Sequence, residues 1–153
     1  MQYAITLKHD SLTFRASHAI ALYTDEAGQP FFEPMHEHLF RVRSTIDGPL
    51  NRHEYVIDFV AALEHLKSIC DSLDRKILLP KDSTDAPDDR PDNSVLLLPC
   101  TNTTAESIAG WIAGEFRALL LEHDLFDAPP GQYRIQLELE ESAGCWAIAR
   151  IYV

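Results

Sequence analysis

Two histidines, His36 and His38, are separated by one residue in a stretch that is typical of a β-strand. Side chains at positions i and i+2 of a strand lie on the same face, so both imidazoles point the same way. A catalytic zinc site usually has three protein ligands and one open position. His18, which ends the sequence Phe-Arg-Ala-Ser-His, is the candidate third ligand. The pattern predicts a zinc site on His18, His36 and His38; the alternative is a set of solvated histidines.

Three carboxylates lie at positions where they could take part in catalysis or in ligand binding. Glu33 lies three residues before His36, and a carboxylate at the edge of a zinc site can act as a general base. Glu140 lies near the end of an alternating strand, where its two oxygens could accept two N–H donors from a guanidine-like edge of a ligand. Asp74 lies at the predicted C-terminus of a helix, where a negative charge is slightly unfavourable. A solvated loop glutamate and a polar strand end are the alternatives for Glu33 and Glu140.

A second group of polar residues lies at the predicted start of another helix. Glu106 is placed to reach a ligand, and Thr104 is its neighbour on the N-terminal side. Thr103 and Glu106 also form a capping-box pattern, which explains Glu106 without any ligand. Both interpretations stay open at this point.

The composition of the chain limits its function class. Its 153 residues suit one domain with a single core, 46% of them are hydrophobic, and the formal net charge is -11. Such an acidic chain argues against a nucleic-acid or anionic-membrane partner. No apolar run approaches the roughly 20 residues of a membrane span, and the N-terminal segment lacks signal-peptide features. Three scattered cysteines fit a reducing compartment, so we expect a soluble, cytoplasmic protein.

The expected elements follow from apolar periodicity, capping residues and turn residues. We expect an α+β fold with an antiparallel sheet, both helices on one face and a single domain spanning residues 1–153. Residues 80–94 are rich in proline and acidic residues and are expected to form an exposed, mobile loop. The predicted strands are Tyr3–Leu7 and its hairpin partner Ser11–Ile20, His36–Ile46, Tyr133–Glu140 and Cys145–Val153; the helices begin after Asp58 and after Asn102.

Several of these segments form an ordered set along nearly the whole chain: Phe14–His18, His36–His38, Ile57–Phe59, Ser72–Asp74, Thr104–Ala109 and Leu139–Glu140. The set resembles the 6-pyruvoyltetrahydropterin synthase / 6-carboxytetrahydropterin synthase family. The family pattern is an F-x-A-x-H strand, an H-G-H strand, a D-F helix start, an L-D-H, a T-x-E-N helix start and an E-T near the end. The ordered set is far more specific than any one of its parts.

The resemblance implies the tunnelling fold, a four-stranded antiparallel sheet backed by two helices. It also implies a homo-hexamer built as a dimer of trimers, with sites between subunits. Zinc is implied on the three histidines, and 7,8-dihydroneopterin triphosphate is the implied substrate. Glu140 is implied to anchor the amino-pyrimidinone edge of the pterin, with Thr104 and Glu106 lining the pocket.

The chain departs from the family pattern at three places. The family's usual cysteine, a few residues before H-G-H, is missing; Glu33 instead matches an E-x-x-H-G-H variant that resembles a branch releasing 6-hydroxymethyl-7,8-dihydropterin. The L-D-H motif reads Leu73-Asp74-Arg75, and arginine cannot exchange a proton near neutral pH. His65 and His123 are available as replacements. Glu37 takes the place of the glycine and is expected on the opposite face of the strand.

The motifs and their departures from the family pattern are therefore compatible with two functions. The first is a zinc-dependent pterin side-chain lyase with Glu33 as base and Asp74 as a relay member. The second is a non-catalytic or repurposed member that binds zinc and pterin without turnover. A structural domain with chance histidines is a third interpretation, which requires the whole ordered set to be coincidence.

Overall fold

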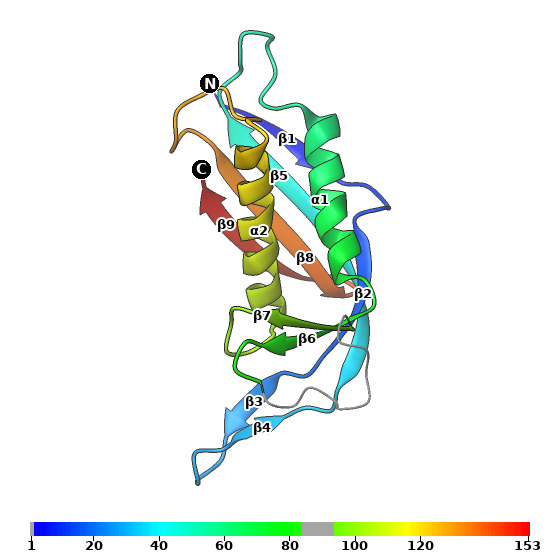
Figure 1. The fold of residues 1–153 in the computed structure, drawn as a ribbon. Helices are drawn as coiled ribbons and strands as arrows, with labels where there is room; N and C mark the ends of the chain where they lie inside the picture. Colours follow the sequence, from blue (N-terminus) through cyan, green and yellow to red (C-terminus); the bar gives the residue numbers. More distant parts are fainter. Residues whose placement is uncertain (1, 84–93) are drawn as a thin grey trace.

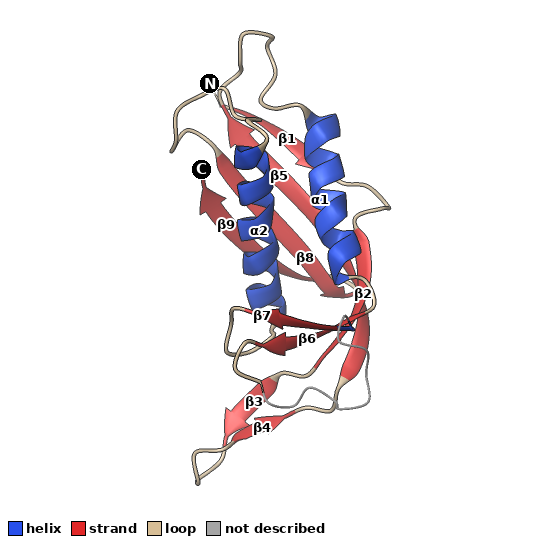
Figure 2. Cartoon of the chain, viewed as in Figure 1, coloured by secondary structure: helices blue, strands red, loops and turns tan. Residues whose placement is uncertain are grey.

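The computed structural model describes residues 2–83 and 94–153 and shows a curled sheet covered on one face by two helices (Figures 1 and 2). The main sheet has seven strands in the order β7-β6-β2-β5-β8-β9, with β1 also paired to β5. A separate two-stranded hairpin, β3-β4, projects from one end of the molecule. The strands are β1 (Tyr3–Leu7), β2 (Thr13–His18), β3 (Ala21–Thr24), β4 (Pro30–Phe32), β5 (His36–Gly48), β6 (Lys76–Pro80), β7 (Val95–Leu98), β8 (Arg134–Ser142) and β9 (Cys145–Tyr152).

Strand β5 organises the sheet because its 13 residues are long enough to pair with two strands placed end to end. β1 pairs antiparallel with Ser44–Gly48, and β2 pairs antiparallel with His36–Arg41. The predicted hairpin between β1 and β2 is therefore wrong, since both strands use the same edge of β5. The opposite edge of β5 pairs with β8, which in turn pairs with β9.

The sheet is also larger than the four antiparallel strands implied by the family resemblance. β6 pairs parallel with β2 and with β7, so the sheet is mixed. β6 has three consecutive buried residues, Ile77, Leu78 and Leu79. A strand that is buried on both faces has no apolar–polar alternation, and for this reason periodicity did not reveal it.

The two helices begin at side-chain caps. Helix α1 (Phe59–Leu73) starts at Asp58, whose carboxylate accepts hydrogen bonds from the amides of Val60 and Ala61, as predicted. Helix α2 (Ala105–Glu122) starts at Thr104, whose hydroxyl accepts from the amide of Ser107. The expected capping box on Thr103 is wrong, because Thr103 lies one residue before the cap and is fully buried.

One hydrophobic core joins the helices to the sheet. The apolar side chains of β2 and β8 alternate toward it, as predicted: Phe14 and Ala16 on β2, and Ile135, Leu137 and Leu139 on β8 are all buried. On the other face of the sheet, β5 and β8 carry ion pairs between Arg41 and Glu140 and between Arg43 and Glu138. Neither helix in residues 2–83 and 94–153 has the length and apolar character that a membrane crossing requires. Most of the predicted acidic loop, residues 84–93, lies outside the described residues.

Candidate metal centre

The antiparallel register of β2 and β5 brings the three predicted histidines together. His18 lies directly opposite His36, and Ala16 lies opposite His38. The ring centroids are 4.9 Å apart for His18 and His36, 5.3 Å for His18 and His38, and 4.7 Å for His36 and His38. One potential ligand nitrogen from each ring lies within 4.8 Å of the other two. The three nitrogens are thus close enough to share one metal ion.

Backbone carbonyls fix the orientation of two of these rings. Nδ1 of His18 is 2.7 Å from the carbonyl oxygen of Thr103, and Nδ1 of His36 is 2.8 Å from that of Pro34. A carbonyl oxygen only accepts, so each Nδ1 donates and each Nε2 keeps its lone pair. Metal-binding histidines in proteins show this same arrangement.

The burial of His18 provides a test of whether a cation fits. Its side chain is 0% exposed, and its Nε2 is a buried nitrogen that lacks a hydrogen-bond partner among the described residues. A buried polar atom without a partner is costly. A metal ion bound to Nε2 removes that cost, and imidazole nitrogen is a ligand that zinc accepts. Burial lowers the pKa of His38, against the opposing effect of Glu141, and this favours the neutral imidazole that metals bind.

Asn102 supports the segment that holds His18 in place. Its side-chain oxygen accepts from the amide of Ala21 at 2.9 Å, and its side-chain nitrogen donates to the carbonyl of Ala21 at 3.0 Å. This pair joins Ala21, the first residue of β3, to the residue before Thr103, and Thr103 carries the carbonyl that orients His18. Sequence reasoning missed Asn102 because an asparagine before a helix ordinarily indicates only a turn or a cap.

Glu33 lies at the rim of the histidine cluster. Its Oε1 is 3.6 Å from Nε2 of His36 and accepts a hydrogen bond from the amide of Ile20 at 3.2 Å. The side chain is 24% exposed, so it is accessible to a ligand that enters the site. The carboxylate predicted as a general base is therefore held beside the candidate metal centre.

The consecutive glutamates at the end of β8 have different surroundings. Glu140 accepts from Nη1 of Arg41 at 3.1 Å and from the amide of Gly144 at 2.8 Å, on the sheet face away from the helices. The Gly144 amide and then the Arg41 guanidinium lower the pKa of Glu140. Glu140 lines a cavity of about 650 Å³ that also contains Arg43 and Trp146. Within the described residues, the hydrogen-bond partners of the Glu140 carboxylate are Arg41 and Gly144 and do not include the histidines.

Glu141, which sequence reasoning missed, lies against the histidines. Its Oε1 is 2.9 Å from Nε2 of His18 and 3.6 Å from Nε2 of His38. Alternation along β8 places the side chain of Glu141 on the same sheet face as the buried Leu137 and Leu139, opposite to Glu140. Two adjacent acids on one strand point to opposite faces, and this was the signal that could have identified Glu141.

The remaining predicted residues have structural contacts. Oδ1 of Asp74 accepts from the amide of Arg15 at 2.8 Å and ties the end of α1 to β2. Arg75, which follows it, has φ of 60° and an 89% exposed side chain. Thr104 caps α2, and Glu106 is exposed in its first turn.

The two histidines considered as replacements for the relay histidine do not lie at this site. His65 and His123 stack on each other with ring centroids 4.4 Å apart. His123 is the C-cap of α2, and Thr103 lies next to the N-cap of the same helix. An 18-residue helix is about 27 Å long, so the stacked pair is far from His18.

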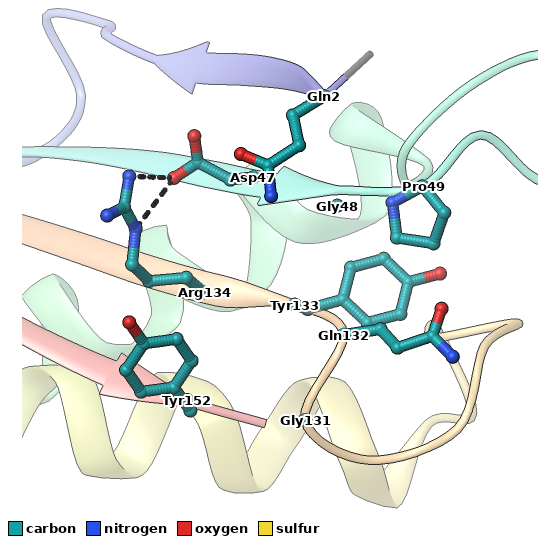
Figure 3. A pocket seen from close by; sticks show the side chains of 9 residues that line it. All are labelled: Gln2, Asp47, Gly48, Pro49, Gly131, Gln132, Tyr133, Arg134 and Tyr152. Atoms are coloured by element: carbon teal, nitrogen blue, oxygen red, sulfur yellow. Dashed lines mark hydrogen bonds and ion pairs between the residues drawn. The ribbon is translucent and has the colours of Figure 1, made fainter.

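A second cavity, of about 350 Å³, lies at the opposite end of the sheet (Figure 3). Gln2, Arg134 and Tyr152 point into it, and Nε and Nη2 of Arg134 donate to Oδ2 of Asp47 at 3.1 and 3.0 Å. None of the predicted site residues lines this cavity, so the candidate site stays with the histidines.

Comparison with known proteins identifies the family. A family model described as 6-pyruvoyl tetrahydropterin synthase matches residues 8–151. The chain belongs to this family. A Methanocaldococcus jannaschii protein provisionally named 6-carboxy-5,6,7,8-tetrahydropterin synthase is 28% identical over 124 residues, which cover 70% of this chain and 72% of that protein.

Solved structures of the 6-pyruvoyl tetrahydropterin synthase family have the same fold. The Plasmodium vivax synthase superposes with a TM-score of 0.79 at 19% identity, covering 100% of this chain and 99% of that one. The Plasmodium falciparum synthase gives 0.77 at 23% identity, with 99% of each chain covered. A P. vivax variant described as a catalytic-residue mutant, with a glutamate replaced by alanine, gives 0.79 at 18% identity, with 100% and 99% covered.

Proposed function

We propose that this protein is a zinc-dependent lyase that cleaves the side chain of 7,8-dihydroneopterin triphosphate. The observation that carries the proposal is the convergence of His18, His36 and His38 with the carboxylate of Glu33 beside them. Bound zinc would lower the pKa of substrate hydroxyls and stabilise the negative charge that develops on their oxygens. The three imidazoles would hold the ion through Nε2 of His18 and His36 and through a ring nitrogen of His38.

Glu33 is the proposed general base. The Ile20 amide fixes its Oε1, and the side chain is partly open to solvent, so it can accept a proton from a side-chain hydroxyl of the substrate. The missing family cysteine leaves this carboxylate as the candidate base, and a glutamate is the catalytic residue replaced in the P. vivax variant. From the resemblance of Glu33 and His36–His38 to the E-x-x-H-G-H variant, we propose 6-hydroxymethyl-7,8-dihydropterin as the product.

The pterin ring is proposed to bind through Glu140, Thr104 and Glu106. Glu140 lies on the sheet face away from the helices and the other two lie at the start of α2, so the proposal requires a site between subunits. Glu140 now accepts from Arg41 and Gly144, so binding a pterin edge requires it to exchange at least one of these donors. Asp74 stays a candidate relay member, although its Oδ1 is engaged by the Arg15 amide. Its second oxygen is 3.7 Å from Nε of Arg75, and arginine cannot pass on a proton.

The decisive experiment is mass-resolved product analysis of the zinc-loaded protein with 7,8-dihydroneopterin triphosphate. We expect 6-hydroxymethyl-7,8-dihydropterin from the wild type. Glu33→Gln should abolish turnover while it retains pterin binding. Glu37→Gln is the matched control, because Glu37 lies between the two β5 histidines in sequence but pairs with Arg15 and is exposed. Unchanged turnover by Glu33→Gln would remove Glu33 from the mechanism.

A second candidate function is a zinc- and pterin-binding protein without turnover. The absence of the family cysteine from the sequence and Arg75 in place of the relay histidine favour it. Recovery of intact substrate from the wild-type reaction, together with measurable pterin binding, would support this function over the lyase.

We also propose a homo-hexamer built as a dimer of trimers. β1 and β9 each pair on one side only, and Tyr3 on β1 and Tyr152 on β9 are 42% and 65% exposed. Pairing of such edges between subunits would continue the sheet. Analytical ultracentrifugation should give six times the chain mass of 17.3 kDa; a monomeric mass would contradict the proposal.

A further inference from the structure

The carboxylate of Glu141 lies against two of the three histidines. A single oxygen, Oε1, approaches Nε2 of both His18 and His38, at 2.9 and 3.6 Å. Glu33 forms an ion-pair contact with His36 and accepts a hydrogen bond from the Ile20 amide. Glu141 is therefore the carboxylate that faces two of the three candidate ligands at once.

The contact between Glu141 and His18 joins two atoms that both have lone pairs. Nδ1 of His18 must donate to the carbonyl of Thr103, which leaves Nε2 as an acceptor, and a carboxylate oxygen is also an acceptor. Nε2 of His18 is buried and forms no hydrogen bond within the described residues. Two lone pairs that face each other at this distance repel, unless Nε2 is protonated or a metal cation lies between the two atoms. Zinc accepts both imidazole nitrogen and carboxylate oxygen.

We propose that Glu141 is a fourth protein ligand of the metal in the substrate-free protein. The inference rests on the proposed metal site and extends it from three ligands to a closed set of three histidines and one glutamate. Structural zinc sites are closed in this way, whereas catalytic sites keep a position for water or substrate. Alternation along β8 places Glu141 on the sheet face that carries the histidines.

A metal site with four protein ligands can still support catalysis if substrate can displace one of the ligands. The side chain of Glu141 is 29% exposed, so it has room to move away from the metal centre, while His18 is 0% exposed and is fixed by Thr103. A substrate hydroxyl would take the position that Glu141 leaves. Glu141 would thus keep water from the metal until substrate binds.

Metal binding by the purified protein tests the inference without any measurement of activity. Zinc affinity is measured by competition with a chromophoric chelator for the wild type, Glu141→Gln and Glu37→Gln. We expect Glu141→Gln to bind zinc at least about 10-fold more weakly, while Glu37→Gln stays close to wild type. Cobalt replaces zinc in a parallel titration, because its visible absorption reports the number and geometry of its ligands.

The possible results distinguish the role of Glu141 as a fourth ligand from the existence of the three-histidine metal site. We expect wild-type protein with cobalt to show a four-coordinate spectrum that Glu141→Gln changes and Glu37→Gln does not. Equal zinc affinity and an identical cobalt spectrum for wild type and Glu141→Gln would overturn the role of Glu141 and leave the three-histidine site intact. Failure of the wild type to bind either metal would overturn both the inference and the proposed metal-dependent function. Circular dichroism of each variant confirms that the fold is retained.

Discussion

At the residue scale, backbone carbonyls decide which nitrogen each imidazole presents. Thr103 and Pro34 accept from Nδ1 of His18 and His36, so the lone pair on each Nε2 is available for a metal. Sequence spacing places three histidines on one sheet face but does not choose the nitrogen. The two carbonyls determine which ring nitrogen is available to a metal, so the residues that position these carbonyls are part of the candidate site.

Asn102 provides a test of this indirect support. Asn102→Ala removes both hydrogen bonds to Ala21 and frees the segment that carries the Thr103 carbonyl. We expect zinc affinity to fall by about 10- to 100-fold, the range typical of residues that orient metal ligands. Competition titration measures the change.

Asn51→Ala is the control for Asn102→Ala. Asn51 also bonds backbone amides through its side-chain oxygen, those of His53 and Tyr55, but it lies in the loop before α1. Its replacement should leave zinc affinity unchanged. Equal affinities for both variants and the wild type would show that Asn102 has no part in positioning His18.

At the element scale, β5 determines both the sheet and the site. Its first residues carry His36 and His38, and its last residue, Gly48, packs against the ring of Tyr133 near the second cavity (Figure 3). A Cβ at Gly48 would overlap that ring. The close approach explains why a glycine ends the strand.

Gly48→Ala should therefore destabilise the protein. We expect the free energy of unfolding to fall by about 1–3 kcal/mol, because Tyr133 is 1% exposed and its ring must shift within the core. Urea denaturation measures the loss. Gly110→Ala in α2 is the control: a Cβ there meets nothing within 4 Å, and alanine is the better helix former by about 0.5–1 kcal/mol. A Gly48→Ala variant as stable as the wild type would show that Tyr133 yields without cost.

At the scale of the whole molecule, the candidate metal centre joins parts that are distant in the chain. His18 belongs to β2, His36 and His38 to β5, and Thr103 to the segment before α2. A metal ion bound there would link these parts in the folded state only. Ligands that bind the folded state shift the folding equilibrium in its favour.

Zinc should accordingly raise the thermal stability of the protein. At a free zinc concentration about 100 times Kd the gain is about 2.7 kcal/mol, or about 5–10 °C in Tm for a chain of this size. Differential scanning calorimetry with and without a chelator measures the shift. His36→Ala should lose most of it. An equal zinc effect on wild type and His36→Ala would place the stabilising ion elsewhere on the protein.

The polar face of the sheet shows how charge is distributed over the molecule. Arg41 pairs with Glu140, Arg43 with Glu138, and Arg134 with Asp47. The guanidinium of Arg43 also lies 4.3 Å from the ring centroid of Trp146. Each of these three arginines is therefore paired with a carboxylate on this face of the sheet.

The sequence alone determined the features that depend on local backbone geometry. A two-residue spacing on a strand placed His36 and His38 on one face, alternation buried the apolar side of β8, and Asp58 began α1. Each follows from the fixed direction of side chains along a strand or from the unpaired amides at a helix start. The ordered motifs also identified the family, which the match over residues 8–151 confirms.

Only the tertiary structure decided which distant segments meet. The same edge of β5 accepts β1 and β2 in turn, so the register that sets His18 opposite His36 depends on two pairings that no local pattern encodes. The contact of Glu141 with the histidines depends on the register of β8 against β5, which sets Glu140 opposite Arg41. Such pairings are selected by burial of the whole core and by completion of backbone hydrogen bonds, which are sums over the entire chain.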